Sequence, residues 1–173
     1  MYSLGEIEAQ CKKASKGVGL SWGLAEEAGL IARHLSEVNL PGSDSVYTNL
    51  KFIEDNGWED NLIDIEFLDQ IRKPISGLLL GVMILDQLSN IVDYKASFND
   101  PVIGPLAVAG ALLRLQNERY FFSLSWDNCQ ITMDDEGFTV SGKNLNPKIV
   151  HWFVVSIQKS SKKPLLNKGI NNR

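Results

Sequence analysis

The sequence predicts an α+β fold, with an N-terminal helical hairpin and further helices packed on a small C-terminal antiparallel sheet. Apolar residues recur every three or four positions as far as about residue 117, as they do in amphipathic helices. From Tyr120 onward they alternate with polar residues, as in half-buried strands. The 173 residues, 44% of them apolar, suffice for one hydrophobic core, and we expect residues 1–158 to form a single globular domain.

The first helix is expected from Ser3 to Lys16. Ser3 and Glu6 have the spacing of a capping box, and Gly17 is a natural stop. One apolar stripe runs along this helix and consists of Leu4, Ile7, Cys11 and Ala14.

The second helix is expected from Trp22 to Val38, with Ser21 as its N-cap. Its stripe consists of Leu24, Ala28, Ile31 and Leu35. The short link Gly17–Leu20 then makes the two helices a hairpin.

The middle of the chain is less regular. Short helical candidates lie at Val46–Glu54 and Ile63–Ile71, separated by the Asn56-Gly57 break. Residues 75–92 are apolar almost all round, which suits a buried helix or a buried strand, and the length favours a helix over Leu79–Val92. After two proline-containing breaks, residues 106–117 are expected to be helical.

The C-terminal third predicts strands. Residues 120–126, 130–133 and 138–141 alternate and are separated by turn residues, which indicates a three-stranded meander. Residues 149–157 are rich in β-branched and aromatic side chains and fit either a strand or a one-sided helix.

The last fifteen residues, 159–173, carry five basic and no acidic side chains. They give this segment a charge of +5 and leave −9 on the rest of the chain. We expect a flexible basic tail; the alternative is an arm that docks on the acidic body of a neighbouring subunit.

The composition excludes several classes of protein. A net charge of −4 is opposite to what a nucleic-acid-binding surface requires. The longest apolar run, Ile75–Leu85, is too short to cross a bilayer, and the first residues do not resemble a secretory signal. Cys11 and Cys129 are expected to be free thiols, and the expected location is the cytoplasm.

The most distinctive segment is Lys13–Gly29, KASKGVGLSWGLAEEAG. Glu26 and Glu27 are candidate general acids or bases beside Trp22, with Arg33 as a further candidate for ligand binding. Neighbours on a helix point about 100° apart, so the two carboxylates cannot face one reacting atom. The structural alternative is that both acids lie in the early turns, where the helix dipole favours negative charge.

No other cluster predicts chemistry. The histidines, His34 and His151, are not at metal-ligand spacing and are expected to be structural. Gly17, Gly19 and Gly23 do not have the spacing of a dinucleotide-binding loop, and Gly23 is expected to let another backbone pack close to the start of its helix. No metal, cofactor or nucleophilic residue is predicted.

The block WGLAEEAG, Trp22–Gly29, together with the helix before it, resembles a bacterial family known only as a conserved domain of unknown function. Weaker similarity continues through Gly81–Asp86 and Asp100–Leu113. Residues 19–42 also resemble the opening helix of the malate/lactate dehydrogenase family that lacks the usual dinucleotide fold. Neither resemblance implies an activity or a cofactor here.

These observations favour a non-catalytic accessory or small-ligand-binding protein. The alternative is a small enzyme, or an enzyme subunit, that uses Glu26 or Glu27. Self-association is expected, because a three-stranded meander has free edges.

Overall fold

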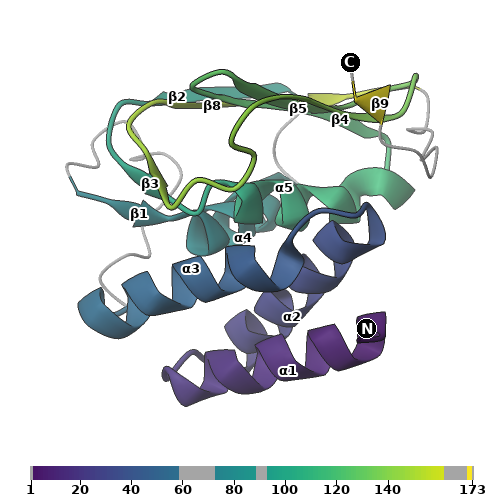
Figure 1. Cartoon of the computed structure of the whole chain (residues 1–173). Helices are drawn as coiled ribbons and strands as arrows, with labels where there is room; N and C mark the ends of the chain where they lie inside the picture. Colours follow the sequence, from purple (N-terminus) through teal and green to yellow (C-terminus); the bar gives the residue numbers. More distant parts are fainter. Residues whose placement is uncertain (1, 59–72, 89–92, 162–170, 173) are drawn as a thin grey trace.

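The structure is a computed structural model that describes residues 2–58, 73–88, 93–161 and 171–172. Figure 1 shows two layers, with helices on one side and a sheet on the other, which confirms the α+β prediction. The helices are α1 (Leu4–Gly17), α2 (Trp22–Glu37), α3 (Gly42–Asn56), α4 (Gly77–Gln87) and α5 (Leu106–Leu112), the last continued by the 3₁₀ turn η4 (Leu113–Asn117).

The predicted hairpin of α1 and α2 is confirmed, including both N-caps. The Glu6 N–H donates to Ser3 Oγ at 3.3 Å, and Ser3 N–H donates back to Glu6 Oε2 at 2.8 Å. Ser21 Oγ accepts from the Leu24 N–H at 3.3 Å. Side chains that hydrogen-bond the first free N–H groups thus set the start of each helix.

The central predictions are confirmed in part. α3 begins earlier than predicted and ends where Gly57 takes a positive φ of 74°. Residues 75–92 contain a two-residue strand, β1 (Ile75–Ser76), followed by α4, so the helical interpretation is correct as far as Gln87. The helical candidate at 63–71, like residues 89–92, lies outside the described residues.

The main sheet has the strand order β2-β8-β4-β5-β6-β9. Its strands are β2 (Asp93–Phe98), β4 (Tyr120–Trp126), β5 (Cys129–Met133), β6 (Phe138–Gly142), β8 (Phe153–Lys159) and β9 (Asn171–Asn172). All neighbours are antiparallel except β9, which runs parallel to β6. A second, smaller sheet joins β1, β3 (Val102–Ile103) and β7 (Ile149–Val150).

The predicted meander β4-β5-β6 is confirmed, but it is not the whole sheet. Residues 149–157 contain strands, so the helical alternative for them is wrong. β8 lies between β4 and β2, and β2 was not predicted from the sequence. The first residue of the expected tail, Lys159, belongs to β8, and the Ser160 N–H donates to the Arg119 carbonyl at 2.7 Å.

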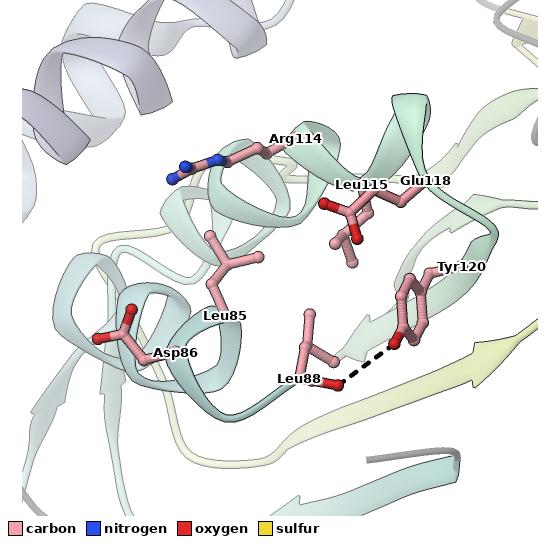
Figure 2. A pocket seen from close by; sticks show the side chains of 7 residues that line it. All are labelled: Leu85, Asp86, Leu88, Arg114, Leu115, Glu118 and Tyr120. Atoms are coloured by element: carbon pink, nitrogen blue, oxygen red, sulfur yellow. Dashed lines mark hydrogen bonds between the residues drawn. The ribbon is translucent and has the colours of Figure 1, made fainter. Parts of the chain in front are cut away.

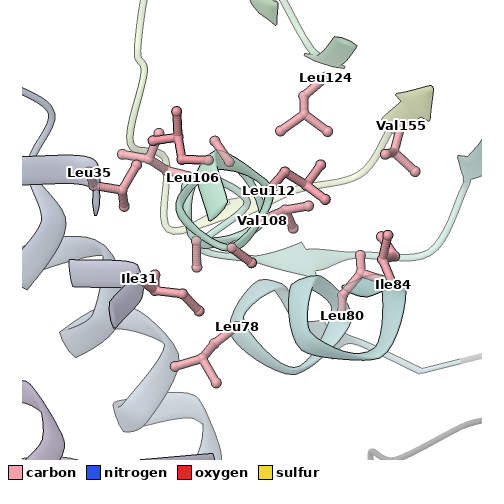
Figure 3. Packing of buried hydrophobic residues seen from close by; sticks show 14 of the residues in the cluster. Ile31, Leu35, Leu78, Leu80, Ile84, Leu106, Val108, Leu112, Leu124 and Val155 are labelled. Carbon is pink, nitrogen blue, oxygen red and sulfur yellow. The ribbon is translucent and has the colours of Figure 1, made fainter. Parts of the chain in front are cut away.

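The core lies between the outer helices and the inner face of the sheet. α5 is buried at all seven positions, which explains why its sequence shows no polar face. In Figure 3, Ile31 and Leu35 of α2 approach α4 and α5 from one side, and Leu124 and Val155 of the sheet from the other. Among the described residues, no helix is long and apolar enough to span a membrane.

Candidate functional site

Three of the four candidate site residues lie along the contact between α1 and α2. Glu26 forms an ion pair with Lys12 (2.6 Å), and Arg33 forms ion pairs with Glu8 (2.9 Å) and with Glu37 (3.0 Å). Each of these charges joins the two helices or supports a neighbour on the same helix, and each is partly exposed to solvent. Exposed pairs of this kind contribute little to stability, because water and salt screen their charges.

Trp22 lies at the same contact and is 67% exposed. The Nζ atoms of Lys16 and Lys12 lie 4.8 and 5.7 Å from its ring centroid, in cation–π contacts. The exposed Trp22 ring therefore does not form the apolar cleft that a catalytic carboxylate would need.

The close approach of the hairpin occurs at Gly29, not at Gly23. A Cβ on Gly29 would lie 2.9 Å from the Glu8 carbonyl oxygen, whereas nothing lies within 4 Å of one on Gly23. Trp22, Glu26, Gly29 and Arg33 follow a spacing of four, three and four residues, so they share one side of α2. Much of the WGLAEEAG block is thus explained by helix packing.

Glu27 points to a different part of the molecule. Its carboxylate accepts from Arg114 on η4 at 2.7 Å and is 24% exposed. Glu26 and Glu27 therefore face different elements, as their adjacency predicted. The helix dipole does not explain them, because the first turn of α2 contains no acidic residue.

Arg114, the partner of Glu27, also lines a pocket between the end of α4, η4 and the start of β4, shown in Figure 2. The pocket has a volume of about 260 Å³. Its lining residues are Leu85, Asp86, Leu88, Arg114, Leu115, Glu118 and Tyr120. The three leucines give it an apolar floor.

Polar groups surround this floor. Figure 2 shows Asp86 and Glu118 on opposite sides of the pocket, and the Tyr120 hydroxyl donates to the Leu88 carbonyl at 3.3 Å. The Nζ of Lys159 lies 6.0 Å from the Tyr120 ring centroid. Within the described part of the chain, neither Asp86 nor Glu118 forms an ion pair, whereas Arg114 is paired with Glu27.

A second hollow, of about 210 Å³, lies on the outer face of the sheet beside Phe121. Its lining combines apolar residues with hydroxyl and amide residues, and Asp134 is the one charged residue among them: Phe121, Phe122, Ser123, Thr132, Met133, Asp134, Ser156 and Gln158. One oxygen of Asp134 already accepts from the N–H groups of Glu136 and Gly137 in the β5–β6 turn. This hollow therefore offers fewer unused charged groups than the pocket beside Tyr120.

The remaining reactive residue types are dispersed. His34 Nδ1 lies 3.3 Å from the Gly110 carbonyl oxygen, and His151 is exposed. Both thiols are buried; burial raises the pKa of Cys11, and it raises that of Cys129 to about 11, so neither is a ready nucleophile at neutral pH. Among the described residues, no three His, Cys, Asp or Glu side chains gather as metal ligands would.

Comparison with known proteins bears mainly on the N-terminal helices. Residues 2–71 match a family described as "Protein of unknown function (DUF3726)". This match covers α1 to α3 and less than half of the chain. It supports the resemblance to a domain of unknown function, and it adds no support for the dehydrogenase resemblance. No curated protein and no solved structure matched the chain.

The sequence did not predict the pocket. Asp86 ended a segment singled out for its family resemblance, and Tyr120 was recognised as the start of a strand. Arg114 and Glu118 lie in a polar stretch without any motif. The packing of α4 against α5, together with the contact between η4 and β4, brings these four side chains around one pocket.

Proposed function

We propose that this chain is a non-catalytic protein that binds a small organic amine in the pocket between α4, η4 and β4. The observation that supports this most directly is the charge around the pocket. Arg114 is neutralised by Glu27, which leaves the carboxylates of Asp86 and Glu118 to attract a cation. A unit charge about 4 Å from a carboxylate gains roughly 1 kcal/mol in water and about 4 kcal/mol near a protein surface.

The chemistry of the lining fits an amine with a short carbon chain. Ammonium N–H groups are donors, and ionised carboxylates accept hydrogen bonds. The side chains of Leu85, Leu88 and Leu115 can cover methylene groups, each worth about 0.8 kcal/mol when fully buried. The volume of about 260 Å³ is below the usual 300–1,000 Å³ of drug-sized sites, so the ligand is small.

Calorimetric titration with 1,4-diaminobutane tests this proposal, with butanoate as the comparison of opposite charge. We expect the diamine to bind and to raise the melting temperature, because a ligand that binds only the folded state stabilises it. Glu118→Gln and Asp86→Asn should each weaken binding at least about fivefold, which corresponds to about 1 kcal/mol.

Glu136→Gln is the matched control, because Glu136 is an exposed acid in the β5–β6 turn, outside the pocket. It removes the same charge and should leave the affinity unchanged. Absence of heat with the diamine, or equal affinity for butanoate, would refute the proposal.

The alternative, an enzyme that uses Glu26 or Glu27, is supported by the position of Glu27. Its carboxylate is one ion pair away from the pocket, whereas Glu26 faces α1. Under the binding proposal, Glu27→Gln frees the charge of Arg114 and weakens diamine binding, and it costs less than about 1 kcal/mol of stability. A Glu27→Gln variant with a higher melting temperature and no response to the ligand would favour the catalytic alternative, with Glu26→Gln as its control.

A further inference from the structure

We infer that the outer face of the main sheet binds a neutral oligosaccharide, which lies across β8, β4 and β5 and stacks one sugar ring on Phe121. The site is the hollow of about 210 Å³ beside Phe121, on the face that Figure 1 shows turned away from the helices. The inference does not rest on the proposed amine ligand, because successive residues of a strand point to opposite faces, and Tyr120 lines the other pocket from the inner one.

The outer face of the four central strands carries no charged side chain. In β4, β5, β6 and β8 every second residue is buried, so the residues between them face outward. These ten outward positions hold four serines, two threonines, two glutamines, Phe121 and Val154. Lys159, the one charged residue of these strands, alternates to the inner face, beside the Tyr120 ring. Charged residues make up 22% of the chain and are usually exposed, so about two would be expected at ten outward positions.

The strand register brings the polar lining of the hollow together. Ser123 of β4 lies opposite Ser156 of β8 on one side and opposite Thr132 of β5 on the other. Phe121, two residues before Ser123 on the same face, lies opposite Gln158 of β8. The hollow therefore combines a row of short hydroxyl side chains with a longer aromatic ring and a longer amide at its side.

These groups both donate and accept hydrogen bonds, as sugar hydroxyls do. A serine or threonine hydroxyl has one donor and two acceptor sites, and a glutamine amide has both kinds. Within the described part of the chain, the side chains of Ser156 and Gln158 form no hydrogen bond, and Ser123 Oγ accepts one, from Gln130 Nε2 at 3.4 Å. Asp134 already uses one oxygen to accept from two N–H groups of its turn. The lining therefore suits a ligand with many hydroxyl groups and no charge.

Phe121 distinguishes a sugar from other neutral polar ligands. Its ring is only half-buried, so one side of it is accessible from the hollow. The face of an aromatic ring is negative and attracts the positive edge of C–H bonds. A pyranose ring presents C–H groups on its face and hydroxyls around its rim, so it can stack on Phe121 while its rim meets the hydroxyl row.

The size of the hollow sets how much of the ligand it holds. Its volume is below the usual 300–1,000 Å³ of drug-sized sites, so it holds about one sugar unit. The hydroxyl row continues beyond it, since Thr139 of β6 lies opposite Thr132, and further units can lie along this row. On such an open surface we expect a dissociation constant of about 0.1–10 mM.

Nitrogen–proton correlation NMR of the full chain, titrated with cellotetraose, tests the inference. Cellotetraose is neutral and extended, as a ligand lying across a sheet must be. We expect saturating amide shifts in β4, β5 and β8, and a dissociation constant that changes less than about twofold between about 0.05 and 0.5 M salt, because no charge is screened. Phe121→Ala and Gln158→Ala should each weaken binding at least about fivefold.

Tyr47→Ala and Gln10→Ala are the matched controls. They remove an exposed aromatic ring from α3 and an exposed amide from α1, on the other side of the molecule, and should leave the affinity unchanged. Phe121→Leu keeps an apolar side chain but loses the ring face, so it should also weaken binding at least about threefold, and it keeps the test valid if Phe121→Ala folds poorly. Circular dichroism of each variant shows whether the sheet is intact.

Three results would overturn the inference. The first is a spectrum that does not change at about 20 mM cellotetraose, well above the expected dissociation constant. The second is a set of shifts that does not saturate or that lies outside β4, β5 and β8. The third is wild-type affinity in folded Phe121 and Gln158 variants.

Discussion

Removal of the Asn49 side chain tests how α3 is joined to the starts of α4 and α5. Asn49 lies on α3 and is fully buried. Its Nδ2 donates to the carbonyls of Ser45 (2.9 Å) and Gly104 (3.2 Å), and its Oδ1 accepts from Ser76 Oγ (2.7 Å) and from the Leu78 N–H (3.0 Å). One amide thus joins α3, the start of α4 and the turn before α5.

The cost of Asn49→Ala follows from these bonds. The Leu78 N–H belongs to the first turn of α4, where no helical carbonyl is available to it. The Ser76 hydroxyl loses the acceptor of its proton, whereas the Gly104 carbonyl keeps the Ala107 N–H at 3.1 Å. A buried donor left without an acceptor costs about 1–3 kcal/mol, so the two donors together cost about 2–6 kcal/mol. That is a large part of the 5–15 kcal/mol typical of a domain.

Urea unfolding followed by circular dichroism measures this loss, with Asn56→Ala as the matched control. Asn56 lies on the same helix and its Nδ2 also donates to the carbonyl four residues earlier, at 2.9 Å, but it is exposed. The control should cost less than about 1 kcal/mol, because water replaces the lost bond. If Asn49→Ala costs no more than Asn56→Ala, the inference that the buried amide holds α3 to the starts of α4 and α5 is wrong.

Three further predictions concern single positions. Trp22→Ala should cost less than about 1 kcal/mol in urea unfolding, not the 3–5 kcal/mol of a buried ring, because Trp22 is largely exposed; a larger loss would show that the ring is buried in solution. The unfolding free energy should fall as the pH rises from 9 to about 11, because the folded state keeps the Cys129 proton that the unfolded state has lost. Cys129→Ala should reduce this dependence on pH. An unchanged dependence would show that the Cys129 thiol does not cause it. Gly110→Ala should destabilise the fold by about 1–3 kcal/mol, because the new Cβ would lie 2.8 Å from Ile31 Cγ2. Gly5→Ala is the control and should stabilise by up to about 1 kcal/mol, because nothing lies within 4 Å of its Cβ. If Gly110→Ala is as stable as the wild type, α2 and α5 can separate without cost.

Local patterns in the sequence were sufficient for the elements whose boundaries depend on neighbouring residues. Ser3 and Ser21 start their helices by bonding backbone N–H groups three residues away, and that distance is visible in the sequence. The alternation of Tyr120–Trp126 likewise places every second side chain in the core. Glu26 and Glu27 lie in the early turns of α2, as predicted, but beyond the first turn, where the helix dipole acts most strongly.

Tertiary structure determined which distant segments of the chain pair with or contact one another. β8 lies between β4 and β2 because it pairs with β4, about 30 to 40 residues earlier, and with β2, more than fifty residues earlier. No local pattern in the sequence indicates which strand will pair with which. The same holds for the pocket, because Glu27 neutralises Arg114 across 87 residues of sequence. The sequence by itself determined the hairpin of α1 and α2 and the meander β4-β5-β6, because their caps, stripes and alternation depend on spacing within one element. The pocket lined by Asp86, Arg114 and Glu118 exists only once the elements pack, because these side chains come from segments far apart in the sequence.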